Sequence, residues 1–376
     1  MQCGYWDAGL CRSCTWLETP YADQVAAKQR AAAAALGEWA VEWLPPVTGP
    51  EEGFRTKAKM VVAGTVEAPT LGILAADGRG TDLRACGLHD PRLQAALPVL
   101  AALVTRAALT PYSVPERSGE LKHVIVTVAP DGGLMVRLVL RSTESVARIE
   151  KHLPWLRAEL PDLRVLSVNL QPAHAAVLEG EREDLLLGES LPIGLDGADG
   201  VTLHLGPRSF FQTNTGIAAA LYREAVAWTS SLEVRTVWDL YCGVGGFALH
   251  LARPGRSVHG VEVSPQAVEA ARTSAAEAGV AATFEAGDAT AWIEGREVAD
   301  LVVVNPPRRG LGADLTAALE AARPSYLLYS SCNPATLGRD LAAMPSLVPV
   351  RARVFDMFPQ TGHQEVLVLC RADRGH

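Results

Sequence analysis

Cys332 is the side chain in this sequence whose surroundings best fit a nucleophile. It follows the apolar segment 326–329 and two serines, and it precedes Asn333 and Pro334. This pattern predicts a buried strand that delivers a thiol to the carboxyl edge of a parallel sheet, where open α/β sheets bind their ligands. Sulfur attacks soft electrophiles even when only a small fraction is thiolate. Because most unpaired cysteines are simply small buried hydrophobic residues, the neighbouring motifs must decide between the two interpretations.

A glycine-rich loop, residues 239–247, follows a predicted strand and opens a predicted helix. Gly243 and Gly245 start a G-x-G-x-x-A pattern, which lets the backbone turn tightly and approach a ligand. Glu262 ends the next predicted strand, where a carboxylate can accept both hydroxyls of a ribose, and Asp288 follows the third, where an adenine edge would lie. A plain turn and a solvated strand end are the alternatives, but the combination favours an adenosine-containing cofactor.

A rigid turn, Asn305-Pro306-Pro307, follows the fourth strand predicted in this part of the sequence. Such a turn is typical of enzymes that use S-adenosylmethionine to modify planar nitrogen-containing groups, whereas enzymes that use nicotinamide cofactors do not need it. The two prolines restrict the backbone, so the Asn305 amide would be held in a fixed position. A loop closure without a ligand role is the alternative.

Four cysteines could form a metal or cluster site. Cys3, Cys11 and Cys14 have the spacing C-x7-C-x2-C, and Cys86 lies further along the chain. Four thiolates can complete either a tetrahedral zinc site or an iron–sulfur cluster, and the spacing alone does not distinguish them. The remaining cysteines besides Cys332 are interpreted as packing residues, namely Cys242 and Cys370.

The composition excludes some classes of protein. The chain has 376 residues, of which 48% are hydrophobic, so it can form two or three domains with substantial cores. A net charge of -8 argues against a protein that simply coats nucleic acid, but it allows a local basic patch. The first residues lack the pattern of a signal peptide, and no apolar run approaches the roughly 20 residues needed to span a bilayer. We therefore expect a cytoplasmic protein whose cysteines stay reduced.

The hydrophobic residues have two different spacings along the chain, and these predict two kinds of fold. Before residue 206 the pattern predicts an alanine-rich helix, strands within 54–85, and then helices and strands in the order expected for an antiparallel α+β domain. These later elements are a helix at 91–109, strands at 122–128 and 134–140, a helix at 145–160 and a strand at 163–170. After residue 206, strands and helices alternate, which predicts a doubly wound parallel sheet of the α/β class.

The predicted domain boundaries follow from this change in the pattern of predicted helices and strands. A Gly/Asp-rich stretch at 194–200 separates the two patterns. Residues 1–90 contain the cysteine segment and the first strands, and they are expected to form one unit with the central α+β domain at 91–205. Residues 206–376 form the predicted catalytic domain.

Several motifs together resemble the family of RNA uracil-C5 methyltransferases. They occur in the family's order and cover nearly the whole chain: 210–214, 239–247, 305–310, 329–336, and 355–359 followed by His363 and Glu365. The N-terminal cysteines, the lack of a preceding RNA-binding β-barrel and the asparagine at position 305 are most similar to the branch that acts on 23S rRNA, of the uracil-747 class. Asn305 departs from the aspartate usual in the wider family, and its amide can still accept and donate hydrogen bonds.

The resemblance implies a fold, a chemistry and a role for each matching residue. The fold is a Rossmann-like S-adenosylmethionine-dependent methyltransferase domain preceded by a smaller α+β domain with a cysteine-ligated cluster, which the resemblance favours as [4Fe–4S] rather than zinc. Cys332 is the implied nucleophile that adds to C6 of uracil, and Glu365 is the implied base. The implied cofactor-binding residues are Gln212, Tyr241, Glu262 and Asn305, to which the loop pattern adds Gly243 and Asp288.

The implied partner is 23S rRNA, with no membrane and no obligate protein partner. Phe210, Phe211 or Phe358 could stack on a base that has left its helix, although each could equally belong to the core. A basic channel is predicted for the RNA phosphates. Arg308 and Arg309 are its strongest members, because they flank the predicted active site. The full set of candidate cations is Lys57, Lys59, Lys122, Arg137, Arg141, Arg208, Arg308 and Arg309.

Three other functions remain open from the sequence. The same reaction could act on another RNA, such as the T-loop of tRNA or a second 23S site. An NAD-dependent oxidoreductase with an iron–sulfur cluster would explain the glycine loop and the N-terminal cysteines, but not Asn305-Pro306-Pro307. A non-catalytic RNA-binding protein with a zinc module would leave Cys332 dispensable.

Overall fold

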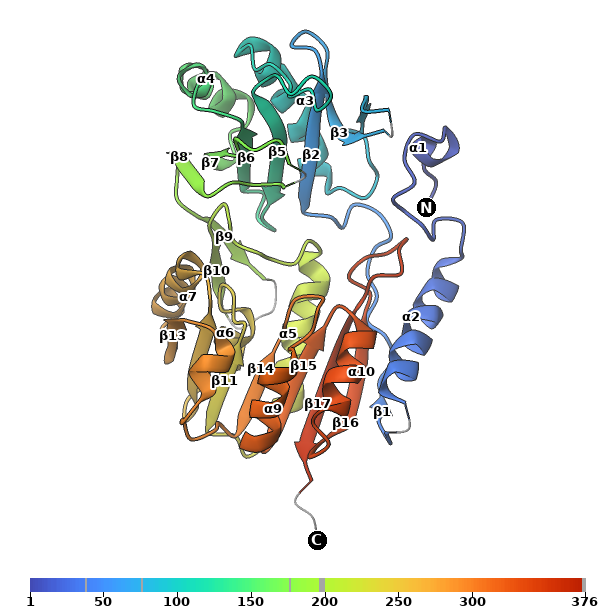
Figure 1. The fold of residues 1–376 in the computed structure, drawn as a ribbon, viewed down its shortest axis with the longest axis vertical. Helices are drawn as coiled ribbons and strands as arrows, with labels where there is room; N and C mark the ends of the chain where they lie inside the picture. The colour runs from blue at the N-terminus through green and yellow to red at the C-terminus, as the bar shows by residue number, and fades with distance from the viewer. Residues whose placement is uncertain (38, 76, 176, 196–199, 374–376) are drawn as a thin grey trace. The chain divides into compact units, whose positions relative to one another are not determined.

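The computed structural model describes residues 1–37, 39–75, 77–175, 177–195 and 200–373. The chain divides into two compact units, which we call the first unit and the second unit. The first unit comprises Met1–Ser13 and Glu51–Ile193, and the second comprises Cys14–Pro50 and Gly194–His376. Figure 1 shows that the larger part of each unit is built around a sheet. The stretch 194–200, which set the predicted boundary, lies partly outside the described residues.

The division differs from the predicted boundaries at residues 14–50, which the sequence analysis grouped with the first strands. From this segment, α2 (Tyr21–Leu36) packs on α10 (Pro334–Ala342), and β1 (Glu42–Trp43) pairs with β16 (Leu347–Phe355). The residues of α2 predict a helix, but the burial of that helix depends on partners far away in the sequence.

The first unit contains a seven-stranded sheet in the order β4-β3-β2-β5-β6-β7-β8. Its strands are β2 (Lys57–Gly64), β3 (Pro69–Leu74), β4 (Gly80–Asp82), β5 (Leu121–Val128), β6 (Leu134–Leu140), β7 (Leu163–Leu170) and β8 (Arg182–Leu187). Its helices are α1 (Gly4–Asp7), α3 (Pro91–Arg106) and α4 (Val146–Glu159). The predicted antiparallel arrangement is wrong in one place. Strands β6 and β7 are parallel, because α4 forms a crossover between them.

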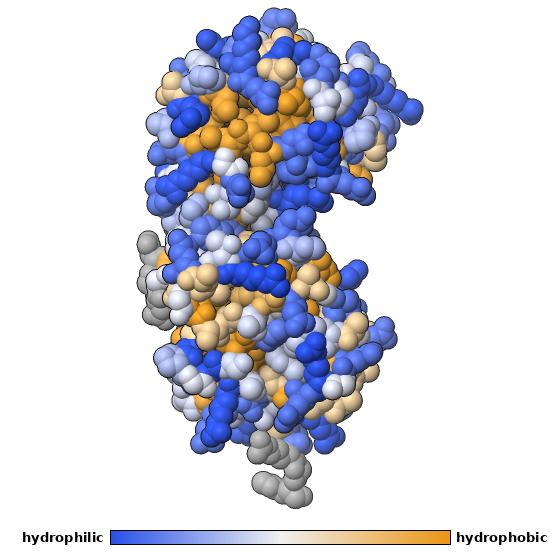
Figure 2. Space-filling model, turned by 90° about the vertical axis from the view of Figure 1, so that its left-hand side faces the viewer, coloured by the Kyte–Doolittle hydropathy of each residue, from blue (hydrophilic) through white to orange (hydrophobic). Residues whose placement is uncertain are grey.

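One face of this sheet carries the core of the first unit. Along β2 the buried side chains are Ala58, Met60 and Val62, which alternate with more exposed neighbours as the two-residue period of a strand requires. They pack with side chains of α3 and α4. Figure 2 shows apolar side chains gathered on the side of this unit where α4 and β8 lie in Figure 1, and Leu185 of β8 is exposed. That surface is poorly suited to RNA phosphates, which bind to cationic groups.

The second unit contains an eight-stranded sheet in the order β1-β16-β17-β15-β14-β11-β12-β13. The strands not yet given are β11 (Thr236–Leu240), β12 (Ser257–Glu262), β13 (Ala282–Ala286), β14 (Leu301–Val304), β15 (Tyr326–Ser331) and β17 (Glu365–Ala372). The helices besides α2 and α10 are α5 (Thr215–Ser230), α6 (Gly246–Leu251), α7 (Pro265–Ala278), α8 (Ala289–Ile293) and α9 (Ala313–Ala322). Two short strands precede α5 in the chain: β9 (Leu191–Gly194), most of which belongs to the first unit, and β10 (Thr202–Leu205) of the second unit.

The parallel strands bring the predicted motifs to one edge of the sheet. Strands β13, β12, β11, β14 and β15 are mutually parallel, whereas β17 runs antiparallel to both β15 and β16. Strand β14 is completely buried, as expected for a central parallel strand. The loops that follow β11, β12, β14 and β15 therefore share the carboxyl edge where α/β sheets bind ligands. None of the described helices is long and apolar enough to cross a membrane.

Candidate active site

The antiparallel pairing of β15 with β17 brings Cys332 and Glu365 together. Ser331 at the end of β15 pairs with Val366, so the next position of the same register sets Cys332 opposite Glu365. In this arrangement the negative charge of Glu365 raises the pKa of the Cys332 thiol. The nucleophile and the base predicted from distant motifs thus occupy adjacent positions at one edge of the sheet.

Burial gives Glu365 the properties of a base that works near neutral pH. Its side chain is 1% exposed, and this loss of water raises the pKa of the carboxyl to about 7. The Ser330 hydroxyl donates a hydrogen bond to the carboxylate, which partly opposes the effect of burial. A carboxylate with a pKa near the working pH can both accept and release a proton, as general base catalysis requires.

Cys332 is half-buried, and its surroundings influence its ionisation in two directions. Burial and then the charge of Glu365 raise the pKa of the thiol, whereas the guanidinium of Arg308 lowers it through its charge and a hydrogen bond. Like charges on Cys332 and Glu365 disfavour each other, so the ionisation of one depends on that of the other.

Changing these neighbours should move the pH at which Cys332 reacts. Glu365→Gln should shift the pH profile of alkylation by iodoacetamide about one unit lower, and Arg308→Met should shift it about one unit higher. The profile is measured by mass spectrometry of the Cys332 peptide. Glu269→Gln, which changes an exposed carboxylate on α7, is the control and should leave the profile unchanged. Identical profiles for all four proteins would contradict the coupling.

Asn333, the residue after Cys332, forms a hydrogen bond to the loop that follows β14. Its Nδ2 donates to the carbonyl oxygen of Arg308 (3.1 Å), and its Oδ1 accepts from the Ala335 N–H (3.1 Å) and so caps α10. This role of Asn333 is not among the predictions from sequence, although an asparagine followed by proline is a signal for the start of a helix. Arg308 is therefore held in position by its backbone while its side chain interacts with Cys332.

A second missed residue, Asp340 of α10, anchors the same loop. Its side chain is 2% exposed, and its Oδ2 accepts from the Leu311 N–H (2.7 Å) and the Tyr329 hydroxyl (2.8 Å). Gly310 has φ +83°, and a Cβ there would lie 2.3 Å from Asp340 Oδ2. No sequence signal links Asp340 to Gly310, because the contact depends on how α10 packs.

The loop after β11 has the backbone geometry of a ligand cradle. Tyr241, Gly243 and Gly245 all have positive φ values, and Tyr241 is one of the non-glycine residues with this conformation. Such strained residues gather at functional sites. A Cβ at Gly243 would meet nothing within 4 Å, so the loop leaves open space there, whereas a Cβ at Gly246 would lie 2.3 Å from the Tyr222 hydroxyl oxygen. The predicted cofactor loop is thus open on one side and tightly packed on the other.

Glu262 lies at the end of β12, beside this loop. Its Oε2 accepts from the Gly243 N–H (3.2 Å) and its Oε1 from the Ser264 N–H (3.0 Å). Each carboxylate oxygen keeps a second lone pair, so the hydroxyls of a ribose can still donate to Glu262. Asp239 is also buried here, and its Oδ1 has no hydrogen-bond partner among the described residues. An unpaired buried oxygen of this kind fits a site whose ligand supplies the donor.

The other predicted cofactor residues are distributed along the same edge. Asp288 follows β13 and caps α8, since its Oδ1 accepts from the backbone N–H groups of Thr290 and Ala291. Asn305 directly follows β14 and is half-buried, and Gln212 is buried shortly before α5. These residues all belong to the second unit, as do Tyr241, Gly243 and Glu262.

The three phenylalanines proposed as base-stacking residues have different environments. Phe211 is buried and belongs to the core, whereas Phe210 is 73% exposed. Phe358 is half-buried and lies edge-on to His363, with ring centroids 6.2 Å apart. Phe210 and Phe358 are therefore the candidates that remain for contact with a base.

Comparisons with known proteins agree with this geometry. A family described as a methyltransferase domain matches residues 237–323, and a family described as tRNA (Uracil-5-)-methyltransferase matches residues 296–373. The 23S rRNA (uracil(747)-C(5))-methyltransferase RlmC of Citrobacter koseri is 45% identical over 378 residues, covering 100% of both chains. RlmC of Escherichia coli strain UMN026 is also 45% identical, covering 98% of this chain and 99% of its own. The chain belongs to the RNA (uracil-C5)-methyltransferase family.

A solved structure of this family supports the fold of the enzyme. The Pyrococcus abyssi tRNA (uracil-54, C5)-methyltransferase, in complex with S-adenosyl-L-homocysteine, is 25% identical and has a TM-score of 0.77. The match covers 95% of this chain and 85% of that one. The methyltransferase fold expected from the sequence is confirmed, and membership of this family argues against the nicotinamide-dependent oxidoreductase.

Two of the cations proposed to contact RNA are engaged inside the first unit of the enzyme. Lys122 is 6% exposed and donates to the side chain of Gln171 and to the carbonyl oxygen of Ala173. Arg137 is 3% exposed and pairs with two glutamates. Both cations are therefore unsuited to binding phosphates. Arg308 and Arg309 are exposed and stay candidates.

Three of the N-terminal cysteines of the enzyme lie close to one another in the first unit. Burial raises the pKa of Cys86, and the charges of Cys3 and Cys11 raise it further, while a hydrogen bond from the Leu88 N–H lowers it. Cys14 follows Cys11 by three residues and is buried. Within the described residues, no group of three or more His, Cys, Asp or Glu side chains is arranged to hold a metal ion. The predicted cluster therefore stays a prediction.

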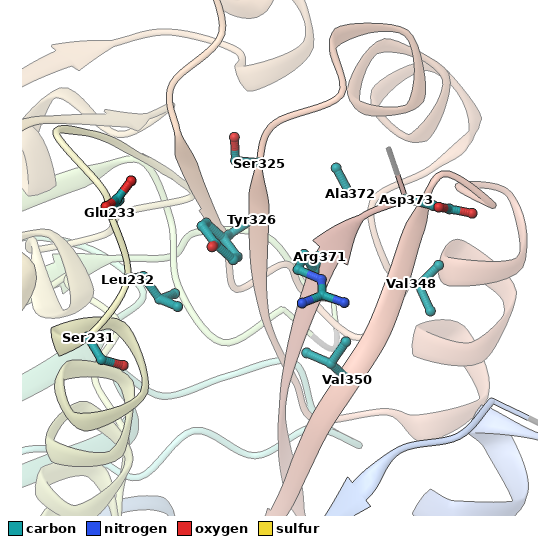
Figure 3. A pocket seen from close by; sticks show the side chains of 10 residues that line it. All are labelled: Ser231, Leu232, Glu233, Ser325, Tyr326, Val348, Val350, Arg371, Ala372 and Asp373. Atoms are coloured by element: carbon teal, nitrogen blue, oxygen red, sulfur yellow. The ribbon is translucent and has the colours of Figure 1, made fainter. Parts of the chain in front are cut away.

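A cavity of about 700 Å³ in the second unit is distinct from the predicted active site. Figure 3 shows Ser325, Tyr326 and Arg371 among its lining residues. Ser325 precedes β15 and Tyr326 begins it, whereas Cys332 follows the end of the same strand. The cavity therefore lies at the opposite end of the strand from the thiol, and uracil chemistry cannot take place in it.

Proposed function

We propose that this enzyme methylates C5 of one uridine in 23S rRNA, equivalent to the uracil 747 named for its relatives, through a covalent bond between Cys332 and C6. The observation that carries the proposed chemistry is the position of Cys332 opposite Glu365 at the end of the β15–β17 pair. The proposed target is supported by 45% identity with the RlmC proteins over the full length of both chains.

The proposed reaction needs both side chains. C5 of uracil is too weak a nucleophile to attack a methyl group directly. When the Cys332 thiolate forms a bond to C6, the C5–C6 π electrons shift toward C4 and its oxygen, and the resulting enolate makes C5 nucleophilic. Covalent catalysis of this kind divides one difficult step into two easier ones. When bound, the cofactor would supply a methyl group on a positively charged sulfur: the C5–methyl bond would form as the sulfur–methyl bond breaks, and the sulfur would leave with those electrons as the neutral thioether S-adenosylhomocysteine.

The second half of the proposed reaction belongs to Glu365. After methyl transfer, C5 carries both the methyl group and the original hydrogen. Glu365 removes that proton, the C–H electrons re-form the C5–C6 double bond, and the C6–S bond breaks to release the thiolate of Cys332. Because burial raises the pKa of Glu365 to about 7, the carboxylate is basic enough to accept a proton at neutral pH.

S-adenosylmethionine is the proposed methyl donor. It is supported by the open space at Gly243, the unpaired oxygen of Asp239 and the free lone pairs of Glu262. The related Pyrococcus abyssi enzyme was solved in complex with the demethylated product, S-adenosyl-L-homocysteine. Glu262 is proposed to accept from the ribose hydroxyls, while Gln212, Tyr241, Asp288 and Asn305 complete the proposed cofactor site.

Glu262→Ala should weaken cofactor binding. Loss of hydrogen bonds to a charged acceptor costs about 1.5–3 kcal/mol, which corresponds to a 10- to 100-fold rise in the Kd for S-adenosylhomocysteine. Isothermal titration calorimetry measures the change. Glu277→Ala, an exposed carboxylate on α7, is the control. An unchanged Kd for Glu262→Ala would exclude its role at the ribose.

The proposed target can be separated from other RNAs by direct assay. The purified enzyme is incubated with labelled S-adenosylmethionine and with 23S rRNA or tRNA from a strain that lacks the gene. We expect label in one uridine of 23S rRNA and little in tRNA. Preferential methylation of the tRNA T-loop would replace the proposed target with another RNA, whereas methylation of neither would contradict the function.

We also propose that Cys3, Cys11, Cys14 and Cys86 bind a [4Fe–4S] cluster with a structural role. The proximity of Cys3 and Cys11 to Cys86 and the Leu88 N–H donated to Cys86 support it, because such donors stabilise thiolate ligands. Iron, sulfide and zinc analysis of anaerobically purified enzyme tests the proposal. Stoichiometric zinc without sulfide would exclude the iron–sulfur cluster.

A further inference from the structure

Helix α2 presents two polar side chains to the interior of the second unit. Gln24 and Lys28 lie one turn apart and are each 1% exposed, and Ala32 and Leu36 continue the same buried stripe. Polar side chains are rarely buried so completely unless they have specific partners. Many of their hydrogen bonds are made to one segment, residues 356–364. This segment connects β16 to β17, and Glu365 follows it as the first residue of β17. We call this segment the 356–364 loop.

Lys28 fixes the beginning of the 356–364 loop. Its Nζ forms an ion pair with Asp356 (2.5 Å), and neither side chain is accessible to solvent. The same Nζ donates to the carbonyl oxygen of Phe358 (3.0 Å). The Tyr21 hydroxyl, also on α2, donates to the other carboxylate oxygen of Asp356 (2.7 Å). A fully buried pair with this many partners holds its neighbours in one geometry.

Gln24 fixes the middle of the same loop. Its Nε2 donates to Oε1 of Gln360, and its Oε1 accepts from the backbone N–H of Gln360, both at 2.9 Å. Gln360 has φ +67°, a left-handed conformation that is unfavourable for a glutamine and persists only when its surroundings impose it. The Trp16 N–H donates to the carbonyl oxygen of Gln360 (3.0 Å). The loop is therefore anchored at residues 356, 358 and 360.

The anchored loop carries groups that lie beside the nucleophile. Besides burial, the charges of Arg308 and Lys28 lower the pKa of His363, so its ring lies near both cations. Arg308 in turn interacts with Cys332. Phe358 packs edge-on to His363. Because the 356–364 loop leads directly into Glu365, which lies opposite Cys332 in the register of β15 and β17, this aromatic pair is held close to the predicted active site.

Helix α2 also contacts the segment that follows the nucleophile. A Cβ at Gly338 of α10 would lie 2.1 Å from the carbonyl oxygen of Ala35, so the two helices approach each other closely at this glycine. One helix therefore contacts both the helix that starts just after Cys332 and the loop that leads to Glu365.

We propose that Lys28 and Gln24 are positioning residues that hold Phe358 and His363 against the target uracil beside Cys332. The inference rests on the proposed function of the site. The two residues touch neither cofactor nor uracil and act through the backbone of the 356–364 loop. Their loss should therefore slow the attack of Cys332 on a bound uracil and leave cofactor binding unchanged.

The test uses two variants that remove the anchors in different ways. Lys28→Met alone would leave the Asp356 carboxylate buried and unpaired, so it is combined with Asp356→Asn, which removes both charges with little change in volume. Gln24→Leu removes the hydrogen bonds to Gln360 without touching any charge. Formation of the covalent complex is followed with 5-fluorouridine-containing 23S rRNA, S-adenosylmethionine and the full-length enzyme. Fluorine at C5 cannot be removed as a proton, so the complex persists.

Both variants should form the adduct about 10- to 100-fold more slowly at saturating RNA, because small displacements in a reactive complex have effects of this size. Their Kd for S-adenosylhomocysteine should stay within twofold of the wild-type value. Arg256→Met is the matched control. Arg256 is a buried cation that donates to the carbonyl oxygens of Thr229 and Val234 near the start of β11 and β12, at the opposite end of the sheet.

Loss of Arg256 should lower the melting temperature and leave the rate of adduct formation per folded molecule unchanged. Adduct formation within twofold of wild type in both folded α2 variants would overturn the inference. An equal slowing in Arg256→Met would also overturn it, because the effect would then reflect general stability. If the wild-type enzyme binds the RNA and forms no adduct, the proposed function itself fails.

Discussion

Cys332→Ala should abolish the covalent complex with 5-fluorouridine-containing RNA and reduce methylation at least about a thousandfold, which corresponds to about 4 kcal/mol of transition-state stabilisation. Alanine removes the only atom of this side chain that can bond to C6. Without that bond C5 stays a poor nucleophile, and proximity to a methyl donor is not sufficient. Denaturing gel electrophoresis detects the complex, and transfer of labelled methyl groups measures the reaction.

Cys370→Ala is the matched control for this prediction. Cys370 is a completely buried thiol on β17, paired in register with Leu327 of β15, so it belongs to the same part of the sheet. Its loss should lower stability and leave the adduct intact. Cys332→Ala should retain its affinity for S-adenosylhomocysteine, because the proposed cofactor residues lie on other loops. An adduct that survives in Cys332→Ala would assign the nucleophile to another residue.

The parallel strands of the second unit could be predicted closely from the sequence. The sequence pattern predicts strands at 236–240 and 301–304 and a helix at 265–278, and these are the bounds of β11, β14 and α7. The sequence of β14 is a continuous apolar run, because both faces of this strand are buried. Residues typical of turns follow it in the sequence. The positions of Gly243 and Asn305 follow from those bounds, since both lie beyond the end of a strand, and Glu262 is the last residue of β12.

The juxtaposition of Cys332 and Glu365 could not be derived from the strand pattern. It depends on β17 being inserted antiparallel between β15 and β16, and on one exact register. A slip of one residue would turn every side chain of β17 to the other face of the sheet. The resemblance to the RNA uracil-C5 methyltransferases implied the roles of Cys332 and Glu365. The local sequence, however, does not determine that two positions so far apart in the chain pair with each other.

The burial of charged side chains is harder to predict from the sequence than the burial of apolar ones. The sequence predicts Lys122 and Arg137 to be surface cations, but Lys122 donates to Gln171 and Ala173 after β7, and Arg137 pairs with Glu179 and with Glu183 of β8. Lys28 lies in an alanine-rich helix, where a lysine is ordinarily exposed, and its burial depends on Asp356. Whether a cation faces solvent is decided by tertiary partners, so candidate RNA contacts chosen by charge alone contain such errors.

Glu365→Gln should trap the enzyme on ordinary RNA after methyl transfer. Glutamine has nearly the same shape but cannot accept a proton, so the methylated ring would keep its C5 hydrogen and its bond to Cys332. Formation of the adduct should not suffer, because the substitution also removes the charge that raises the pKa of Cys332. Release should slow about 10²- to 10⁴-fold, the usual contribution of general acid–base catalysis. A chase experiment on RNA carrying a labelled methyl group measures it.

The pH dependence of release distinguishes this role from a structural one. Since only the ionised carboxylate accepts a proton, release by the wild-type enzyme should slow as the pH falls through about 7, the pKa of Glu365. The Ser330 hydroxyl lowers that pKa, so Ser330→Ala should move the profile to higher pH without changing the rate at the plateau. Glu365→Gln should lose the dependence. If Glu365→Gln instead fails to form the adduct and accumulates no complex, the carboxylate acts before methyl transfer and the proton is removed by another group.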